Sequence, residues 1–216
     1  MNLKFDGRFG DVQFHAGQYQ DLFALHLVGE SGRFLDRGSK HPEWFNNTIA
    51  LEKIGWQGLL FDWDSSDHDL HLESNPDSRK SPFFCIDVTK PQLIEILKDH
   101  GELHFDYISL DVDDSGYDCL ALLVSNGVTF TCLTYEHDSY FRPVDVLKIP
   151  AYRLLESRGY LALFEDVNFE FGSPFEDWWI DPAYYDPQIL ALAHKNIYYK
   201  DCLSVLEVNQ NAIKRR

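Results

Sequence analysis

Acidic side chains stand directly after several short apolar runs of this 216-residue sequence. Carboxylates accept hydrogen bonds from hydroxyl and amino groups, hold divalent cations and take up protons from reacting groups. Where such runs are parallel strands, their carboxyl ends meet at one edge of a sheet, and ligands bind there. We therefore expect a ligand site at this edge. The candidate residues are Asp36, Gly38, Asp62, Asp87, Asp111, Glu136 and His137.

The end of the first expected strand favours a nucleoside ligand without phosphates. Asp36 is followed by Arg37 and Gly38, and a single glycine permits a sharp turn with close approach of a ligand. A dinucleotide-binding turn needs three spaced glycines, which argues against a nucleotide-dependent oxidoreductase. S-adenosylmethionine, with its amino acid tail, sulfonium and ribose, suits this strand end better. Asp36 could equally cap the following helix or close a turn.

The second and third expected strands each end in an aspartate. Asp62 can accept hydrogen bonds from both ribose hydroxyls, as an acidic residue after the second strand does in nucleotide-binding folds. Asp64 is more plausible as a helix cap. Asp87 could accept a hydrogen bond from an adenine amino group, or equally cap the helix that begins at Pro91. Together these residues predict the nucleoside half of a binding pocket.

Two neighbouring strand ends carry the groups that could perform chemistry. The fourth expected strand ends in Asp111 within a run of carboxylates, and the fifth ends in Glu136 and His137. His137 could remove a proton from an acceptor hydroxyl, because the pKa of histidine lies near neutrality. Alternatively, Asp111, Glu136 and His137 could ligate a divalent metal that acidifies the hydroxyl. The sequence leaves both alternatives open and assigns no residue firmly as a metal ligand.

The alternation of short apolar runs with helical patterns predicts an α/β fold, a doubly wound and mostly parallel sheet with helices on both faces. We expect one domain over residues 1–216, because the chain is too short for two full-sized cores. The expected strands are 33–36, 58–63, 83–88, 105–112, 128–135 and 161–167, with an antiparallel strand at 175–180. The expected helices are 42–55, 65–73, one from residue 91, 117–124, 152–159 and 187–207.

Composition excludes several classes of function. A formal net charge of -16 repels nucleic acid over most of the surface, and no stretch approaches the ~20 apolar residues of a membrane span. The four cysteines lack zinc-site spacing and are expected to be reduced. Residues 1–10 contain no apolar core of a secretory signal. We expect a soluble cytoplasmic protein, and a homo-oligomer is compatible with the sequence.

Several motifs resemble the FkbM family of methyltransferases. Residues 32–42 are similar to the family's opening strand and turn, and residues 46–48 and 51–60 match its Ser-Asn-Thr and Leu-Glu-x-x-Gly-Trp-x-Gly patterns. Residues 105–113 look like the family's strand that ends in Asp-Val-Glu, and residues 20–23 resemble a preceding Gln-Asp. The resemblance covers the core at about 18–180, which a helix at 187–207 would close.

The resemblance implies a Rossmann-like class I methyltransferase that uses S-adenosylmethionine to methylate a hydroxyl of a sugar or other small molecule. By position, Asp36 and Gly38 would contact the amino acid part of the donor, Asp62 its ribose, and Asp111 would lie where donor and acceptor meet. Arg37 replaces an apolar residue of the family's donor loop. This departure favours the rival hypothesis of a non-catalytic binding protein with the methyltransferase fold.

Overall fold

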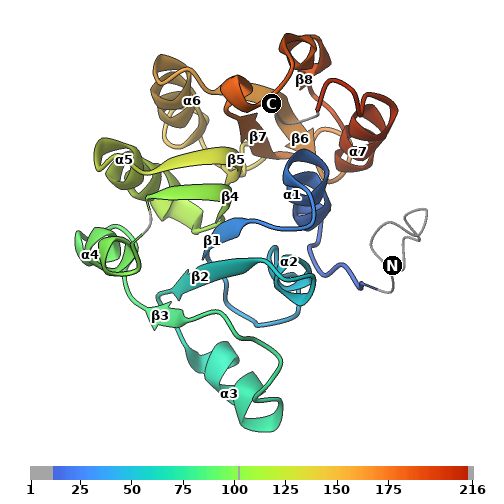
Figure 1. Cartoon of the computed structure of the whole chain (residues 1–216). Coiled ribbons are helices and arrows are strands. Elements are labelled where there is room, and N and C mark those ends of the chain that lie inside the picture. Colours follow the sequence, from blue (N-terminus) through green and yellow to red (C-terminus); the bar gives the residue numbers. More distant parts are fainter. Residues whose placement is uncertain (1–11, 102, 214–216) are drawn as a thin grey trace.

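The computed structural model describes residues 12–101 and 103–213, and within them eight strands form one sheet (Figure 1). Residues 1–10, in which the sequence analysis expects no secretory signal, lie outside this part of the chain. The strands are β1 (Arg33–Arg37), β2 (Gln57–Asp62), β3 (Phe83–Cys85), β4 (His104–Leu110), β5 (Thr129–Glu136), β6 (Leu161–Asn168), β7 (Pro174–Ile180) and β8 (His194–Lys195). Their order across the sheet is β3-β2-β1-β4-β5-β7-β6-β8.

The sheet is mostly parallel, as expected from the sequence. Strand β7 runs antiparallel to β5 and β6, and every other pairing of the described strands is parallel. In the register, Arg37 pairs with both Phe61 and Leu110, and Leu110 pairs with Tyr135. The carboxyl ends of β1, β2, β4 and β5 therefore finish level with one another at a single edge.

Helices cover the sheet from two sides. Figure 1 shows α4, α5 and α6 on one side and α1, α2 and α7 on the other, with α3 beyond the edge strand β3. Two clusters of buried apolar side chains fill the spaces between the helices and the sheet. The helices are α1 (Gln20–Val28), α2 (Ile49–Lys53), α3 (Ser66–Ser74), α4 (Gln92–Asp99), α5 (Gly116–Ser125), α6 (Lys148–Ser157) and α7 (Tyr199–Val208). Among the described residues, none of these helices has the length and apolar character that crossing a bilayer requires.

The antiparallel strand β7 joins the two cores. Trp178 and Trp179 are both buried, one in each of the two apolar clusters, because consecutive side chains of a strand point to opposite faces. Trp178 packs against Phe23 of α1, and Trp179 packs against Tyr152 of α6. Both indoles therefore belong to the interior of the protein.

The helix expected over residues 42–55 is wrong in its first half. Only Ile49–Lys53 is helical, because the left-handed φ of 52° at Phe45 interrupts the chain before it and Asn46 takes N–H groups that a continuous helix would use. The Nδ1 atom of His41 accepts the N–H groups of Glu43 and Trp44 at 3.0 and 2.9 Å. Asn46 Oδ1 accepts the N–H of Ile49, the first residue of α2, at 2.9 Å. Residues 41–48 are consequently an ordered loop.

The expected helix over residues 187–207 is also divided. A 3-10 helix spans Pro187–Leu192, β8 follows, and α7 begins only at Tyr199. Strand β8 pairs with β6, which extends the chain in the middle of the expected helix. The sequence analysis also missed α1, whose residues are nearly all buried, so that no polar stripe marks it as amphipathic.

Candidate ligand-binding site

The loops after β1 and β4 touch at Gly38. Its φ of 84° lies in the left-handed region, and a Cβ added there would come within 1.6 Å of the Asp111 carbonyl oxygen. The contact is fixed by backbone hydrogen bonds, from Asp111 N to the Arg37 carbonyl and from Gly38 N to the Phe61 carbonyl, both 3.0 Å long. Only glycine fits this position without moving the Asp111 backbone.

A cavity of about 1160 Å³ opens at this edge of the sheet. The loops that follow β1, β2, β3 and β4 line it, which is where ligands bind in open α/β sheets. Of the residues predicted from the sequence, it brings together Gly38, Asp62, Asp87 and Asp111. The remaining lining residues are Ser39, Lys40, His41, Trp44, Phe45, Trp63, Asp64, Asp67, Cys85, Ile86, Val88, Val112, Asp113, Asp114 and Ser115.

Asp62 ends β2 and is 5% exposed. Its Oδ2 atom accepts the N–H of Lys40 at 2.9 Å, and its Oδ1 atom accepts the N–H of Asp64 at 3.1 Å. The carboxylate thus ties the loop after β1 to the loop after β2. Each oxygen has two lone pairs, so both can still accept a hydroxyl of a ligand.

Asp87 follows β3 and is exposed on the cavity. Its Oδ1 atom accepts hydrogen bonds from the hydroxyl and the N–H of Thr89, at 2.7 and 2.9 Å. These hydrogen bonds lower the pKa of Asp87, and Lys90 lies 3.4 Å from its second oxygen. Asp87 therefore closes a turn before α4 and faces the cavity at the same time.

Asp36 does not line the cavity. It is buried, and the Thr48 hydroxyl donates to its Oδ2 atom at 2.6 Å. Burial raises the pKa of Asp36 to about 6. The guanidinium of Arg79, which sequence reasoning missed, donates to Thr48, to Asn46 and to the Pro42 carbonyl. Asp36 thus belongs to a buried network that holds the loop of residues 41–48.

Asp111 and Glu136 form a pair of carboxyl groups at the ends of β4 and β5. Burial raises the pKa of both, and the neighbouring Asp111 adds to the rise at Glu136, to about 12. Glu136 is therefore protonated at neutral pH and donates its hydrogen bond to the Asp111 carboxylate. Two adjacent carboxyl groups that share one proton can act as a base towards a bound hydroxyl.

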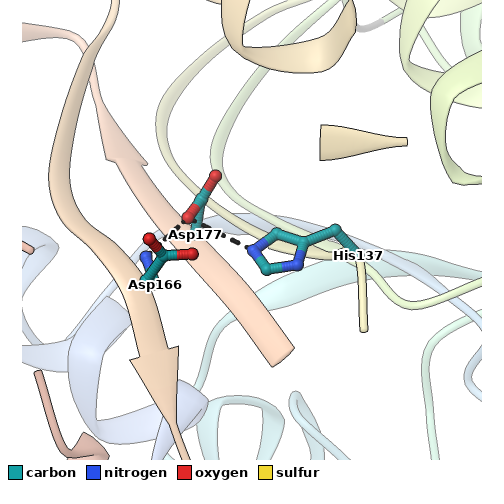
Figure 2. Close-up of side chains that lie close together, drawn as sticks. All are labelled: His137, Asp166 and Asp177. Atoms are coloured by element: carbon teal, nitrogen blue, oxygen red, sulfur yellow. Dashed lines mark hydrogen bonds and ion pairs between the residues drawn. The ribbon is translucent and has the colours of Figure 1, made fainter. Parts of the chain in front are cut away.

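His137 faces Asp177, with Asp166 nearby (Figure 2). It is buried, its Nε2 atom faces Asp177 Oδ1 at 3.3 Å, and its Nδ1 atom accepts the N–H of Ser139 at 3.1 Å. Asp166 completes a group whose ligand atoms lie within 4.8 Å of one another, as a metal site would require. The ammonium of Lys148 contacts Asp166, however, and lies 3.8 Å from Asp177, so a cation already offsets these carboxylates.

This placement does not suit the role predicted for His137. Its Nδ1 lone pair is occupied by a backbone donor, and its ring does not line the cavity, so it is not positioned to take a proton from a ligand there. Nor does the structure join it to Asp111 and Glu136 as a metal-binding trio. Successive side chains point to opposite faces at this strand end, so Glu136 turns towards Asp111 and His137 towards Asp177.

Arg37 points away from the cavity into the core. It is fully buried, and its three guanidinium nitrogens have no hydrogen-bond partner among residues 12–101 and 103–213. Burial lowers its pKa. Since Arg37 neither lines nor fills the cavity, it does not obstruct a donor there, although an unpaired buried charge is costly to the fold.

Sequence reasoning missed Arg142 and the strained backbone that accompany the lining of the cavity. Arg142, far from β4 in sequence, contacts Asp113, Asp114 and Asp138 and partly offsets their charge. Lys40, Phe45 and Asp113 line the cavity with positive φ values of 30°, 52° and 50°, a conformation that side chains disfavour. Such backbone strain gathers at functional sites. No local pattern in the sequence marks any of these contacts.

The fold of this chain is similar to that of solved structures. No family model matches the sequence, and no curated protein matches it. Among solved structures, an S-adenosylmethionine-dependent methyltransferase from Clostridium acetobutylicum ATCC 824 matches with a TM-score of 0.51 at 10% identity, over 78% of this chain and 92% of that one. The chain shares the fold of S-adenosylmethionine-dependent methyltransferases.

A second similar structure is that of WbdD, crystallised with the kinase inhibitor LY294002. It matches with a TM-score of 0.51 at 19% identity, over 83% of this chain. The match covers 44% of the WbdD chain, so this protein spans less than half of that one. At these identities the likeness concerns the fold alone, and the chemistry must be argued from the residues of the cavity.

Replacing Arg37 by methionine should stabilise the protein. The change removes an unpaired buried charge and keeps a side chain of similar length, so we expect the free energy of unfolding to rise by about 1–4 kcal/mol. Urea unfolding at pH 7 measures this, with the exposed Arg153→Met on α6 as the control. A loss of stability in Arg37→Met alone would show that the guanidinium has a partner in the folded protein.

Glu176 should make stability depend on pH. It is buried, accepts hydrogen bonds from Gln20 and Trp178, and burial raises its pKa to about 8. The folded state therefore keeps a proton that the unfolded chain loses near pH 4.5. This stabilisation is complete below that pH and disappears as the pH rises towards 8, by at most about 1.4 kcal/mol per pH unit.

Glu176→Gln should remove this contribution to the pH dependence. Urea unfolding of wild type and variant at pH 5, 6.5 and 8 is the measurement, and the exposed Glu207→Gln on α7 is the control. The stability of Glu176→Gln relative to wild type should increase from pH 5 to pH 8. A difference that stays constant over this range would mean that Glu176 titrates normally in the folded protein.

Proposed function

We propose that the protein is an S-adenosylmethionine-dependent methyltransferase of the FkbM type, which methylates a hydroxyl of a sugar or other small molecule. One observation carries the proposal: Gly38, Asp62, Asp87 and Asp111, separate in sequence, line one cavity at the carboxyl edge of a sheet with the methyltransferase fold. Asp36 and His137, which lie outside the cavity, keep no direct role in the proposal.

The residues present fit this donor. The contact between Gly38 and the Asp111 backbone leaves no room for a Cβ and brings the floor of the cavity close to a ligand. Asp62 offers carboxylate oxygens to ribose hydroxyls, and Asp87 offers one to an amino group. Aspartates dominate the charged groups of the lining, which favours a donor with a net positive charge. When bound, the donor supplies an electrophilic methyl group.

The chain's own contribution is to position the acceptor and to accept its proton. In this proposal the Asp111 carboxylate takes the proton of the acceptor hydroxyl, and its raised pKa makes it a stronger base than an exposed aspartate. The proton that Glu136 shares with Asp111 holds that carboxylate in place. Orientation of the two reactants within one cavity supplies much of the rate.

Replacing Asp62 by alanine should weaken donor binding. The change removes the oxygens proposed to meet the ribose and releases the Lys40 and Asp64 N–H groups. We expect the dissociation constants of S-adenosylmethionine and S-adenosylhomocysteine to rise by about tenfold or more, equivalent to about 1.4 kcal/mol. Isothermal titration calorimetry with each compound is the measurement.

Two controls separate this effect from a general loss of structure. Asp99→Ala changes an exposed aspartate at the end of α4, outside the cavity, and should leave both affinities unchanged. Thermal unfolding of each variant, with and without S-adenosylhomocysteine, checks that the fold is retained. If wild-type protein binds neither compound at millimolar concentration, the chain is a non-catalytic relative in fold and the proposed function is wrong.

A further inference from the structure

Two aromatic side chains line the cavity with their rings exposed. Trp44 is 72% exposed and Phe45 is 84% exposed, and both belong to the loop of residues 41–48. The His41 ring stacks on Trp44 with centroids 4.8 Å apart and planes 9° from parallel. Because His41 also accepts the backbone N–H of Trp44, the position of the indole is set before a ligand arrives.

The backbone at Phe45 supports a role in binding. Its φ of 52° is left-handed, which is unfavourable for a bulky residue. The exposed ring recovers little of this cost through burial in the core. The loop is nevertheless held in place, since Asn46 donates to the Ser39 and His41 carbonyls and accepts from Arg79. The fold therefore maintains a strained segment that displays two aromatic rings towards a cavity.

The charges that share this cavity are mostly negative. Lys40 is the basic residue of the lining, and Lys90 and Arg142 pair with lining carboxylates from outside it. An excess of negative charge remains, which repels phosphate and carboxylate groups and attracts ammonium groups. The lining carboxylates belong to Asp62, Asp64, Asp67, Asp87, Asp111, Asp113 and Asp114.

The size of the cavity leaves room for more than the donor. Its volume of about 1160 Å³ exceeds the roughly 300–1,000 Å³ that is usual for one small ligand. In the proposed function the nucleoside of the donor lies near Asp62, Trp63 and Asp87, at and beyond the ends of β2 and β3. The part not assigned to the donor includes Trp44, Phe45 and the carboxylates of Asp111, Asp113 and Asp114.

We propose that the acceptor is a hydroxyl compound that combines a ring with an ammonium group, as an amino sugar or a phenolic amine does. The inference rests on the proposed function and specifies its substrate. The ring stacks on Trp44 or Phe45, through its π face in a phenol or its C–H face in a sugar. The ammonium is held by carboxylates and aromatic faces together, a combination that also selects against anionic sugars.

Matched probes that share a ring and differ in charge test this proposal. Glucosamine, N-acetylglucosamine and glucose 6-phosphate form one series, and tyramine, N-acetyltyramine and 4-hydroxyphenylacetate form the other. Calorimetric titration of the whole chain is carried out with and without saturating S-adenosylhomocysteine. In the series that contains the acceptor type, the ammonium compound should bind at least about tenfold more tightly than its acetylated form, and the anion should not bind. The series that binds tells a sugar from a phenol.

Variants of the aromatic pair localise the effect. Trp44→Ala or Phe45→Ala should weaken binding of the ammonium compound by about tenfold and leave the affinity for S-adenosylhomocysteine within twofold, and Trp44→Phe should restore most of the loss. Phe171→Ala removes an exposed phenylalanine outside the cavity and should change neither affinity.

The outcomes separate this inference from the proposed function. Equal binding of ammonium and acetylated probes, tighter binding of the anions, or no binding of either series overturns the acceptor assignment, even where S-adenosylhomocysteine binds. Loss of S-adenosylhomocysteine binding in Trp44→Ala would place the indole on the donor side and also overturn it. Failure of the wild-type chain to bind S-adenosylhomocysteine overturns the proposed function, whereas the titrations without it still report the charge preference.

Discussion

The close contact between Gly38 and the backbone of Asp111 is the constraint on which the site depends. It places the loop after β1 against the loop after β4. Residues at the carboxyl ends of these two neighbouring strands therefore lie close together. Strands that finish in register would still leave their loops free to diverge. Here the missing Cβ allows the close contact, and the hydrogen bond from Asp111 N to the Arg37 carbonyl holds the two together. The cavity then forms between these loops and those after β2 and β3.

Crowded carboxyl groups around this contact shape the electrostatics of the protein. Different cations and protons offset them at different places. Arg142 offsets the charge of Asp113, and Lys148 offsets that of the buried Asp166 and Asp177. Glu136 is neutral because it keeps its proton. At the cavity itself the compensation is incomplete. The folded chain therefore tolerates this acidic surface because part of its negative charge is offset by cations and retained protons.

The strand-end rule predicted four residues that line the cavity, because it depends only on apolar runs and the residues that end or follow each. The rule does not say which way a side chain turns. Asp36 and His137 also stand at strand ends, yet one faces the Thr48 network and the other faces Asp177. A shift of one residue along a strand reverses the face, and sequence alone does not fix that choice when polar residues occupy both positions.

The loop of residues 41–48, which carries Trp44 and Phe45, was not predicted from the sequence for a different reason. Pro42 followed by regularly spaced apolar residues is typical of a helix start, whereas the left-handed φ of Phe45 and the capture of the Thr48 and Ile49 N–H groups by Asn46 interrupt it. Asn46 also accepts a hydrogen bond from Arg79. In the sequence Asn46 precedes α3 and Arg79 follows it. No periodicity links residues that far apart along the chain.

The hydrogen bonds of Arg79 join the loop of residues 41–48 to the segment that carries α3 to the edge strand β3 (Figure 1). Glu52 strengthens the connection by accepting the N–H groups of Lys80 and Ser81. Hydrogen bonds thus connect the segment between α3 and β3 to the loop of residues 41–48, so that a shift of one displaces the other. Insertions or replacements in this peripheral arm would therefore change the shape of the cavity, so specificity can diverge through changes at the margin of the fold.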